Sequence, residues 1–527
     1  METLTRADVH HDRVAQVRVA AKAGLADWLF VGVIVVTAWW YLRVSRGQSF
    51  LRDDWRVATR SLSFSDLLEP HNGHLSLVPL AIYRAMLGEF GFETYTPYRL
   101  LGSISLLSLG VALFLFVRSR VGSPVALVVA VSVLWLPTMN LTPFLANYHV
   151  ALVCAVVCAV AMPSVDRRSD VILGLALALA LATSSVGVAA AAACAVHAMT
   201  FRLRPSRLIA IAVPSLLWVL WWRTSSNQPR PAVRPSILSG LAEVANGVFG
   251  SFGALTGGWW VGGVALLAGW VILFVQRMMT DRMSARTQLA WTVGLVFWWV
   301  GLVWSRPDAA DSFNTGRYEY VGAVLILLSV VPAGPVEWLR TANARWRMAA
   351  PALVIIGTIV LVNHDELRDA ARDRAAAGAR AEMVVYELEL TAASIEPTRR
   401  LPSELDEITV RDYREKVVAR YGLPIDQHQS TDEAMIERNA LHVPTGPPPS
   451  DDRACAAGPV PLPIAGEVSL HTRDQPAMLR ARRFGSSMQD VRLVPAHRSA
   501  VASFPGPTIA WAVPWVIDAP GACIHDD

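Results

Sequence analysis

Long apolar runs recur along the 527-residue sequence and constrain its fold more than any other feature. A hydrocarbon core about 30 Å thick is crossed by about 20 helical residues, so runs near that length predict membrane-spanning helices. Only 17% of the residues are charged, against about 25% in soluble domains. We therefore predict an α-helical polytopic membrane protein with about eleven spans, at residues 26–44, 99–117, 124–136, 148–162, 171–182, 186–199, 208–222, 259–275, 289–304, 320–331 and 350–362.

The arginines predict how these helices are oriented. Residues 171–199 are interpreted as two short helices broken at 183–185, because one long helix would put neighbouring arginines on opposite faces of the membrane. The positive-inside rule then places the tail at 1–24 in the cytoplasm and the C-terminus outside a bacterial plasma membrane. No cleavable signal peptide is expected. The basic clusters on the predicted cytoplasmic side are Arg13/Arg18/Lys22, Arg118/Arg120, Arg167/Arg168, Arg202/Arg204/Arg207, Arg277/Arg282/Arg286 and Arg340/Arg345/Arg347.

The sequence changes character after the transmembrane domain predicted at 25–363. Residues 364–527 are expected to form an extracytoplasmic α+β domain, helical at 364–443 and β-rich at 455–527, after a Pro-rich linker. Cys455 and Cys523 are the only cysteines of this tail, which favours a disulfide in an oxidising compartment over two free thiols. Trp511 and Trp515 are more typical of a small β core than of a sugar-stacking surface.

Acidic and imidazole side chains gather in the first outer loop, residues 45–98. Asp53 and Asp54 precede Trp55, and His71 and His74 follow before an amphipathic helix expected at 75–90. Convergence of these groups at the membrane surface would raise the pKa of one carboxyl group toward that of a general base. The alternative is a solvated loop in which neighbouring arginines pair with the aspartates.

A second motif lies where a late span begins. Arg317 and Tyr318 follow Asn314, Thr315 and Gly316 on the same predicted outer face. The forked, permanently charged guanidinium suits a phosphodiester near lipid, and the alternative is an interfacial anchor beside an aromatic belt. Arg223, which follows two tryptophans, is a weaker candidate of the same kind, and for it the anchor interpretation is favoured.

The combination of an Asp-Asp pair after the first span, an amphipathic loop helix, a short helical hairpin and an outer Arg-Tyr motif resembles the GT-C membrane glycosyltransferases, especially those of actinobacterial cell envelopes. The resemblance covers residues 26–362. It implies transfer of a sugar, of the arabinofuranose or mannose class, from a polyprenyl-phosphate donor to a cell-envelope glycan or glycolipid. It also implies a catalytic carboxylate at Asp53 or Asp54 and a phosphate contact at Arg317.

Within this resemblance, Trp55, His71, His74 and Tyr318 are expected to contact the acceptor or sugar. No cofactor is certain, and a divalent cation is left open, because residues 137–147 lack the second acidic motif that some members carry. No nucleic-acid partner is expected. Two other classes remain as alternatives: a non-catalytic scaffold of envelope assembly, and a lipid-linked glycan transporter, for which the nearly uncharged spans give little support.

Overall fold

The computed structural model describes most of the transmembrane region, parts of the tail that follows it and the β-strands of the C-terminal module. The described residues are 24–61, 63–71, 73–136, 146–200, 204–225, 236–305, 316–336, 342–391, 397–398, 400–401, 405, 408–422, and the strand segments between 445 and 526.

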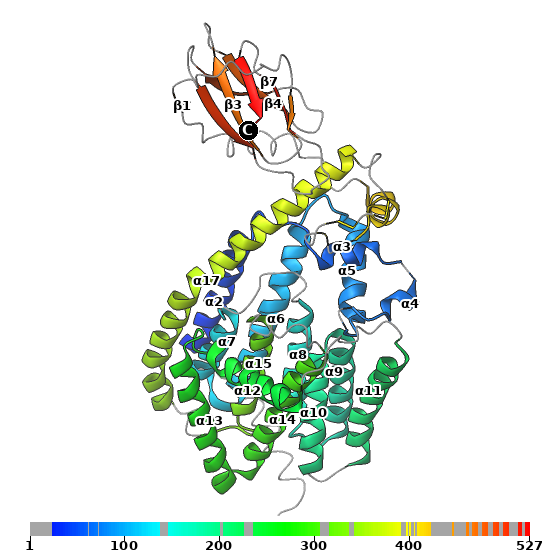
Figure 1. Ribbon diagram of the computed structural model, residues 1–527. Helices are drawn as coiled ribbons and strands as arrows, with labels where there is room; N and C mark the ends of the chain where they lie inside the picture. Colours follow the sequence, from blue (N-terminus) through cyan, green and yellow to red (C-terminus); the bar gives the residue numbers. More distant parts are fainter. Residues whose placement is uncertain are drawn as a thin grey trace, which may run out of the picture. The chain divides into compact units, whose positions relative to one another are not determined.

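The chain divides into two compact units. Figure 1 labels most of their helices and strands. The first comprises residues 1–45, 67–79 and 99–372, and the second comprises residues 46–66, 80–98 and 373–527. Residues of the first outer loop therefore share a unit with the C-terminal tail. Two long helices, α6 (Thr96–Val121) and α17 (Ala342–Thr391), contribute residues to both units.

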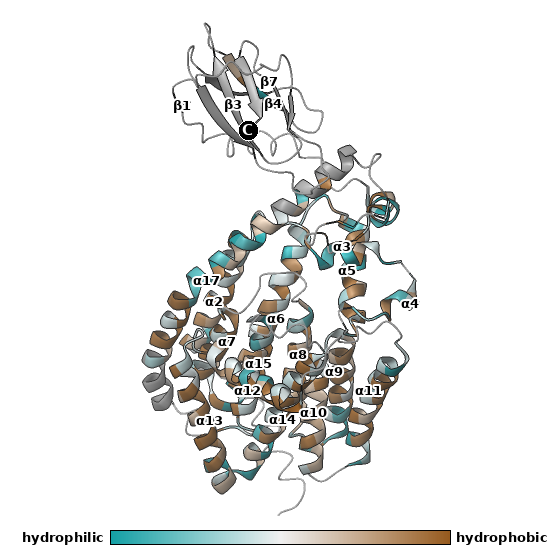
Figure 2. Cartoon of the chain, viewed as in Figure 1, coloured by the Kyte–Doolittle hydropathy of each residue, from teal (hydrophilic) through white to brown (hydrophobic). Residues whose placement is uncertain are grey.

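Helices form the first unit. Besides its part of α6 and α17, it contains α2 (Leu25–Val44), α7 (Ser123–Leu134), α8 (Ala146–Ala161), α9 (Arg167–Thr183), α10 (Val186–Thr200), α11 (Pro205–Thr224), α12 (Ile237–Ala254), α13 (Trp260–Thr280), α14 (Arg282–Ser305) and α15 (Gly316–Val330). Five described helices, α2, α6, α11, α13 and α14, are long and apolar enough to cross a membrane, and α7, α8 and α10 are shorter apolar helices. Apolar residues dominate α13 in Figure 2. The α-helical membrane fold predicted from the sequence is confirmed.

Small residues allow the helices of this unit to approach closely. A methyl group on Gly294 of α14 would lie 2.8 Å from the Ala189 carbonyl oxygen of α10. Gly247 of α12 likewise lies against the ring of Trp299 of α14, whose Nε1 donates to Ser251 Oγ at 3.0 Å. Close packing of this kind stabilises helix pairs in lipid, where the hydrophobic effect contributes little.

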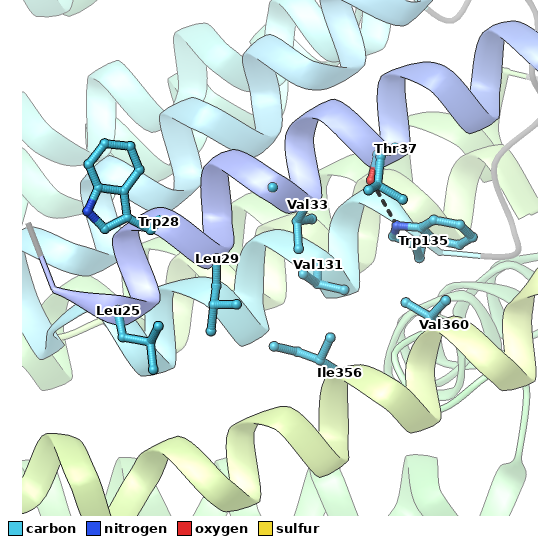
Figure 3. Close-up of a pocket in the computed structure, with 11 residues that line it drawn as sticks. Leu25, Trp28, Leu29, Val33, Thr37, Val131, Trp135, Ile356 and Val360 are labelled. Carbon is cyan, nitrogen blue, oxygen red and sulfur yellow. Dashed lines mark hydrogen bonds between the residues drawn. The ribbon is translucent and has the colours of Figure 1, made fainter.

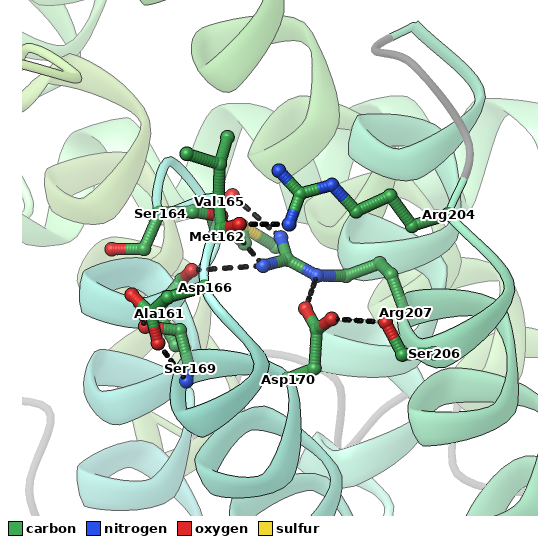
Figure 4. A network of polar contacts seen from close by, with 10 residues as sticks. All are labelled: Ala161, Met162, Ser164, Val165, Asp166, Ser169, Asp170, Arg204, Ser206 and Arg207. Atoms are coloured by element: carbon green, nitrogen blue, oxygen red, sulfur yellow. Dashed lines mark hydrogen bonds and ion pairs between the residues drawn. The ribbon is translucent and has the colours of Figure 1, made fainter. Parts of the chain in front are cut away.

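Two arginines bind carbonyl groups left free at helix ends. Arg207 donates to the Met162 and Ser164 carbonyl oxygens, each at 2.7 Å, and pairs with the buried Asp170 (Figure 4). Arg277 donates to the Val330 carbonyl oxygen at 2.6 Å, at the last residue of α15. The final carbonyls of a helix have no intrahelical partner, so each guanidinium satisfies groups that burial would otherwise penalise. Arginines that predicted a cytoplasmic face thus also fix helix ends.

An apolar groove lies among α2, α7 and the first half of α17 (Figure 3). Its volume is about 470 Å³. Its lining includes Val33 of α2, Val131 of α7 and Ile356 of α17. Trp28, at one end of the groove, is 67% exposed. The polar contact in this lining is the hydrogen bond from Trp135 Nε1 to Thr37 Oγ1, at 3.0 Å.

The second unit combines short helices with a β module. Its helical elements include α3 (Asp53–Thr59), most of α5 (Leu77–Phe90), α18 (Val410–Asp412), η5 (Tyr413–Val418) and α19 (Ala419–Tyr421), while α4 (Phe64–Leu67) lies at its border with the first unit. One antiparallel sheet has the strand order β1-β6-β3-β8, and the other has the order β2-β7-β4-β5. The strands are β1 (Thr445–Gly446), β2 (Val460–Leu462), β3 (Gly466–Thr472), β4 (Ala477–Arg482), β5 (Gln489–Val494), β6 (Ser499–Phe504), β7 (Trp515–Asp518) and β8 (Ala522–Asp526).

The elements agree with the sequence prediction in one place and differ from it in others. The break predicted at 183–185 is present, because α9 ends at Thr183 and α10 begins at Val186. By contrast α12 and α3 were not predicted. The last span and the charged helix after it are one helix of 50 residues, α17, rather than two elements separated near residue 364.

Candidate functional site

The Asp-Asp pair begins α3, directly after an unusual backbone turn. Arg52 has φ 51° and is the only non-glycine residue with positive φ among the described residues. Such a conformation costs of order 1 kcal/mol or more for a residue with a Cβ, and it persists where surrounding contacts impose it. The contact here is Asp54, whose Oδ2 accepts the Leu51 N–H at 2.7 Å across this turn.

Asp54 is fully enclosed, with 0% of its surface exposed. Tyr83 of α5 donates its hydroxyl to Oδ1 at 2.5 Å, and Tyr95 donates to Oδ2 at 3.4 Å. Arg374 of α17 places Nη2 3.9 Å from Oδ2 and donates to the Tyr95 oxygen at 3.3 Å. Both carboxylate oxygens thus have partners within the protein.

Burial dominates the electrostatics of this cluster. It raises the pKa of Asp54 to about 6, although the charge of Arg374 and the hydrogen bonds from Tyr83 and the Leu51 amide lower it. Burial also raises the pKa of Tyr83, and the nearby Asp54 carboxylate raises it further. For Arg374 burial lowers the pKa, but Tyr95 and Asp54 outweigh it, so the net direction is upward. The pKa of the Asp54 carboxyl group therefore lies above that of an exposed aspartate.

Asp53 has a different environment from its neighbour. It is half-buried and is the first residue of α3, whereas Asp54 is the second. Consecutive helical residues point about 100° apart, since a turn contains about 3.6 residues. Only Asp53 therefore combines a carboxylate with partial access to solvent at this end of α3.

Trp55 was predicted to stack on a sugar, but its side chain is 1% exposed. Its ring stacks on Phe92 with centroids 4.7 Å apart, and Nε1 donates to the Phe50 carbonyl oxygen at 3.3 Å. The ring is packed within the protein, and the sugar contact of Trp55 stays a prediction. Trp55 anchors α3 to the aromatic cluster beneath it.

His71 and His74 form a small turn in the first unit. Their backbones exchange two hydrogen bonds of 2.9 and 3.0 Å around Gly73, which has φ 78°. His71 is 4% exposed and His74 is half-buried. Of the two imidazoles, His74 is the more accessible to a ligand.

Arg317 lies in the first turn of α15 with Tyr318 beneath it. Its Nη2 donates to the Tyr318 hydroxyl at 3.0 Å, and its Cζ lies 4.8 Å from the centre of that ring. Tyr318 is 1% exposed and its carbonyl oxygen accepts from Trp298 Nε1 at 3.2 Å, so it supports the guanidinium and does not offer a free face to a sugar. The residue expected to bind sugar is thus a support for the residue expected to bind phosphate.

The remaining predicted residues fall in several places. Arg223 is exposed at the end of α11, as expected of an anchor. Cys455 and Trp511 lie outside the described residues, so the predicted disulfide stays a prediction, with Cys523 in β8 and Trp515 in β7. The structure brings together Asp53, Asp54 and Trp55 in the second unit, and it places His71, His74, Arg223, Arg317 and Tyr318 in the first.

Comparisons with known proteins return one distant similarity. No protein-family model matches the sequence, and no curated protein matches it. Among solved structures, the chain is similar to the crystal structure of ArnT from Cupriavidus metallidurans bound to undecaprenyl phosphate, with 14% sequence identity and a TM-score of 0.45. The match covers 75% of this chain and 86% of that chain. A similarity at this level does not assign the chain to a family.

Sequence reasoning missed three residues of the cluster: Tyr83, Tyr95 and Arg374. Tyr83 lies on the apolar side of the predicted amphipathic helix, where a buried tyrosine hydroxyl needs a partner. No local signal distinguishes Arg374 from the other arginines of its helix. Within the described ranges, no group of three or more His, Cys, Asp or Glu side chains is arranged to hold a metal ion.

Proposed function

We propose that this protein is a membrane glycosyltransferase of the GT-C type. It would transfer a sugar from a polyprenyl phosphate to a hydroxyl group of a cell-envelope glycan or glycolipid outside the plasma membrane. The main support is the contrast between the two consecutive carboxylates. Asp54 is enclosed by protein groups, whereas Asp53 is half-buried at the start of α3. A general base must come within hydrogen-bond reach of its substrate, so the base is Asp53.

The proposed reaction is a single displacement at the anomeric carbon. The acceptor oxygen forms a bond to this carbon while the bond from the carbon to the phosphate oxygen breaks. Asp53 takes the proton of the acceptor hydroxyl, and the electron pair of the broken bond stays on the phosphate. Arg317 binds that phosphate, because a forked cation held in place stabilises developing negative charge. Tyr318 holds the guanidinium by its hydroxyl and its ring face.

Substrate binding extends the proposal to other residues. The groove among α2, α7 and α17 would receive part of the isoprenoid chain, since its lining is almost entirely apolar. His74, with His71 behind it, would orient the acceptor, and Arg223 would make a secondary contact with phosphate. Sugars of the arabinofuranose or mannose class are the donors to try first.

The test is radiolabelled sugar transfer in membranes supplied with polyprenyl-phospho-arabinose or polyprenyl-phospho-mannose. Replacing a general base costs roughly 10²- to 10⁴-fold, which is the loss expected for Asp53→Asn. Removing an electrostatic stabiliser costs roughly 10²- to 10³-fold, which is expected for Arg317→Ala. Asp369 and Arg372 form an exposed ion pair on α17, and because such pairs contribute little, Asp369→Asn and Arg372→Gln are matched controls.

Full activity of Asp53→Asn at matched expression would refute its assignment as the base. If the wild-type protein transferred neither sugar, while binding of labelled polyprenyl phosphate was retained, the transporter alternative would be favoured. Loss of both transfer and binding would favour the scaffold.

A further inference from the structure

Arg374 joins the Asp54 cluster from a position more than 300 residues further along the chain. Its side chain is 16% exposed, while that of Asp54 is 0% exposed. A buried charge is costly unless it is paired and hydrogen-bonded. Nη2 of the guanidinium meets this condition through Tyr95 and Asp54, at 3.3 and 3.9 Å. This pairing is therefore unlike the exposed ion pairs elsewhere on α17.

The same face of α17 is pressed against the backbone that leads into α3. A methyl group on Gly378 would lie 3.0 Å from the Ser49 backbone nitrogen and 3.2 Å from its Cβ, so only glycine fits there without a shift. One turn further, the Glu382 carboxylate accepts a hydrogen bond from the Ser49 side chain. Residues 374, 378 and 382 are spaced by four and therefore share a helix face. Three successive turns of α17 thus hold the segment before the aspartates.

Asp54 links Arg374 to the backbone turn that precedes Asp53. Asp54 Oδ2, which faces Arg374, also accepts the Leu51 N–H. This hydrogen bond closes the turn that contains the positive-φ residue Arg52, and Asp53 is the next residue. Movement of the Asp54 carboxylate would release that turn and change the direction of the Asp53 side chain.

We propose that Arg374 is a positioning residue, an inference that rests on the proposed function. Arg374 and Tyr95 hold the Asp54 carboxylate in place, and this orients Asp53 toward the acceptor hydroxyl. Arg374 itself does not touch the substrate. Its loss leaves acceptor binding intact and slows transfer, because misplacing a reacting group by about 1 Å can cost roughly 10²-fold. Lysine at this position restores part of the rate, since it supplies the charge without the forked geometry.

The pH profile separates positioning from a general loss of stability. The groups that face Asp54 are Tyr83 of α5, Tyr95, Tyr98 of α6, Arg374 of α17, and Asp53 on its own helix. Removing the nearby positive charge makes the Asp54 carboxylate easier to protonate. The acid limb of the rate profile of Arg374→Gln therefore moves to higher pH than that of the wild type.

The experiment measures kcat, the KM for the acceptor and the pH profile for wild type, Arg374→Gln and Arg374→Lys, with Arg372→Gln as the exposed control on the same helix. Arg374→Gln is expected to lower kcat roughly 10²-fold, with KM nearly unchanged and the acid limb displaced. Arg374→Lys should recover part of kcat and most of the displacement. An equal loss at every pH, or a change confined to KM, would overturn the proposal.

A second measurement does not need transfer activity. Amide exchange of a peptide that contains Leu51 should be faster in Arg374→Gln than in wild type. It should be unchanged in Arg372→Gln, because Arg372 pairs with the exposed Asp369 and not with Asp54. Equal exchange in all three proteins would overturn the positioning role. If the wild type transfers no sugar but exchange responds as expected, the proposed function fails while the link from Arg374 to the turn holds.

Discussion

Replacement of Asp54 by asparagine should abolish the pH dependence that this carboxyl group gives to the local stability of the segment with Leu51 and α3. The folded protein raises the pKa of Asp54 from 3.8 to about 6, so between these values the folded state holds more protons than the opened state. Stability contributed by this group is therefore fully present below pH 3.8 and is lost as pH rises through about 6. The full difference is about 3 kcal/mol, since one pKa unit corresponds to about 1.4 kcal/mol.

Amide exchange on the segment that contains Leu51 and α3 measures this contribution locally. Between about pH 7 and about pH 4.5 the linkage amounts to about 2 kcal/mol, or roughly 25-fold in protection once intrinsic exchange rates are corrected. Wild type should gain this protection on acidification, and Asp54→Asn should not. Exposed Asp369→Asn, as the control, should follow wild type. Identical pH dependence in wild type and Asp54→Asn would show that the carboxyl group does not titrate as burial requires.

Three further substitutions test the local structure. Arg52→Gly should raise thermal stability by up to about 1 kcal/mol, because glycine adopts positive φ without a Cβ penalty, and a lower melting temperature would contradict the observed turn. Trp55→Ala should lower the free energy of unfolding by about 3–5 kcal/mol, measured by thermal unfolding, and Trp55→Phe should lower it less. A raised KM at unchanged stability would instead support a sugar-binding role. Arg207→Gln should cost about 3–5 kcal/mol by removing the ion-pair partner of Asp170, and a stability scan matching wild type would show that the buried pair is dispensable.

The spans could be predicted from the sequence because the bilayer imposes a length and an apolar composition that few other folds require. The break between α9 and α10 was also predictable, since the arginines on either side had to share one face. In contrast α12 was not predicted, because the four glycines spaced along it are typical of turns or linkers. Gly247 instead allows close packing against Trp299. Composition alone does not separate these two uses of glycine.

The sequence indicated where a candidate site could lie but not how its residues are organised. Two acidic residues shortly after the first predicted span suggested the site, and that assignment stays a prediction. The partners of Asp54 come from α5, from the segment before α6 and from α17, so they depend on tertiary packing. Arg374 lies on a helix with several similar arginines, and only its burial against Tyr95 distinguishes it. Sequence spacing carries no information about such a contact.

The two adjacent carboxylates of α3 differ in burial. Asp54 lies on the buried side of α3 together with Trp55, whereas Asp53 at the start of the helix is half-buried. Burial of Asp54 raises its pKa and requires partners, which Tyr83, Tyr95 and Arg374 supply. Those partners in turn immobilise the turn from which Asp53 projects. In the proposed mechanism Asp54 would support that turn and Asp53 would be the reactive group, and exchanging the two roles would require α3 to rotate against the aromatic cluster that holds Trp55.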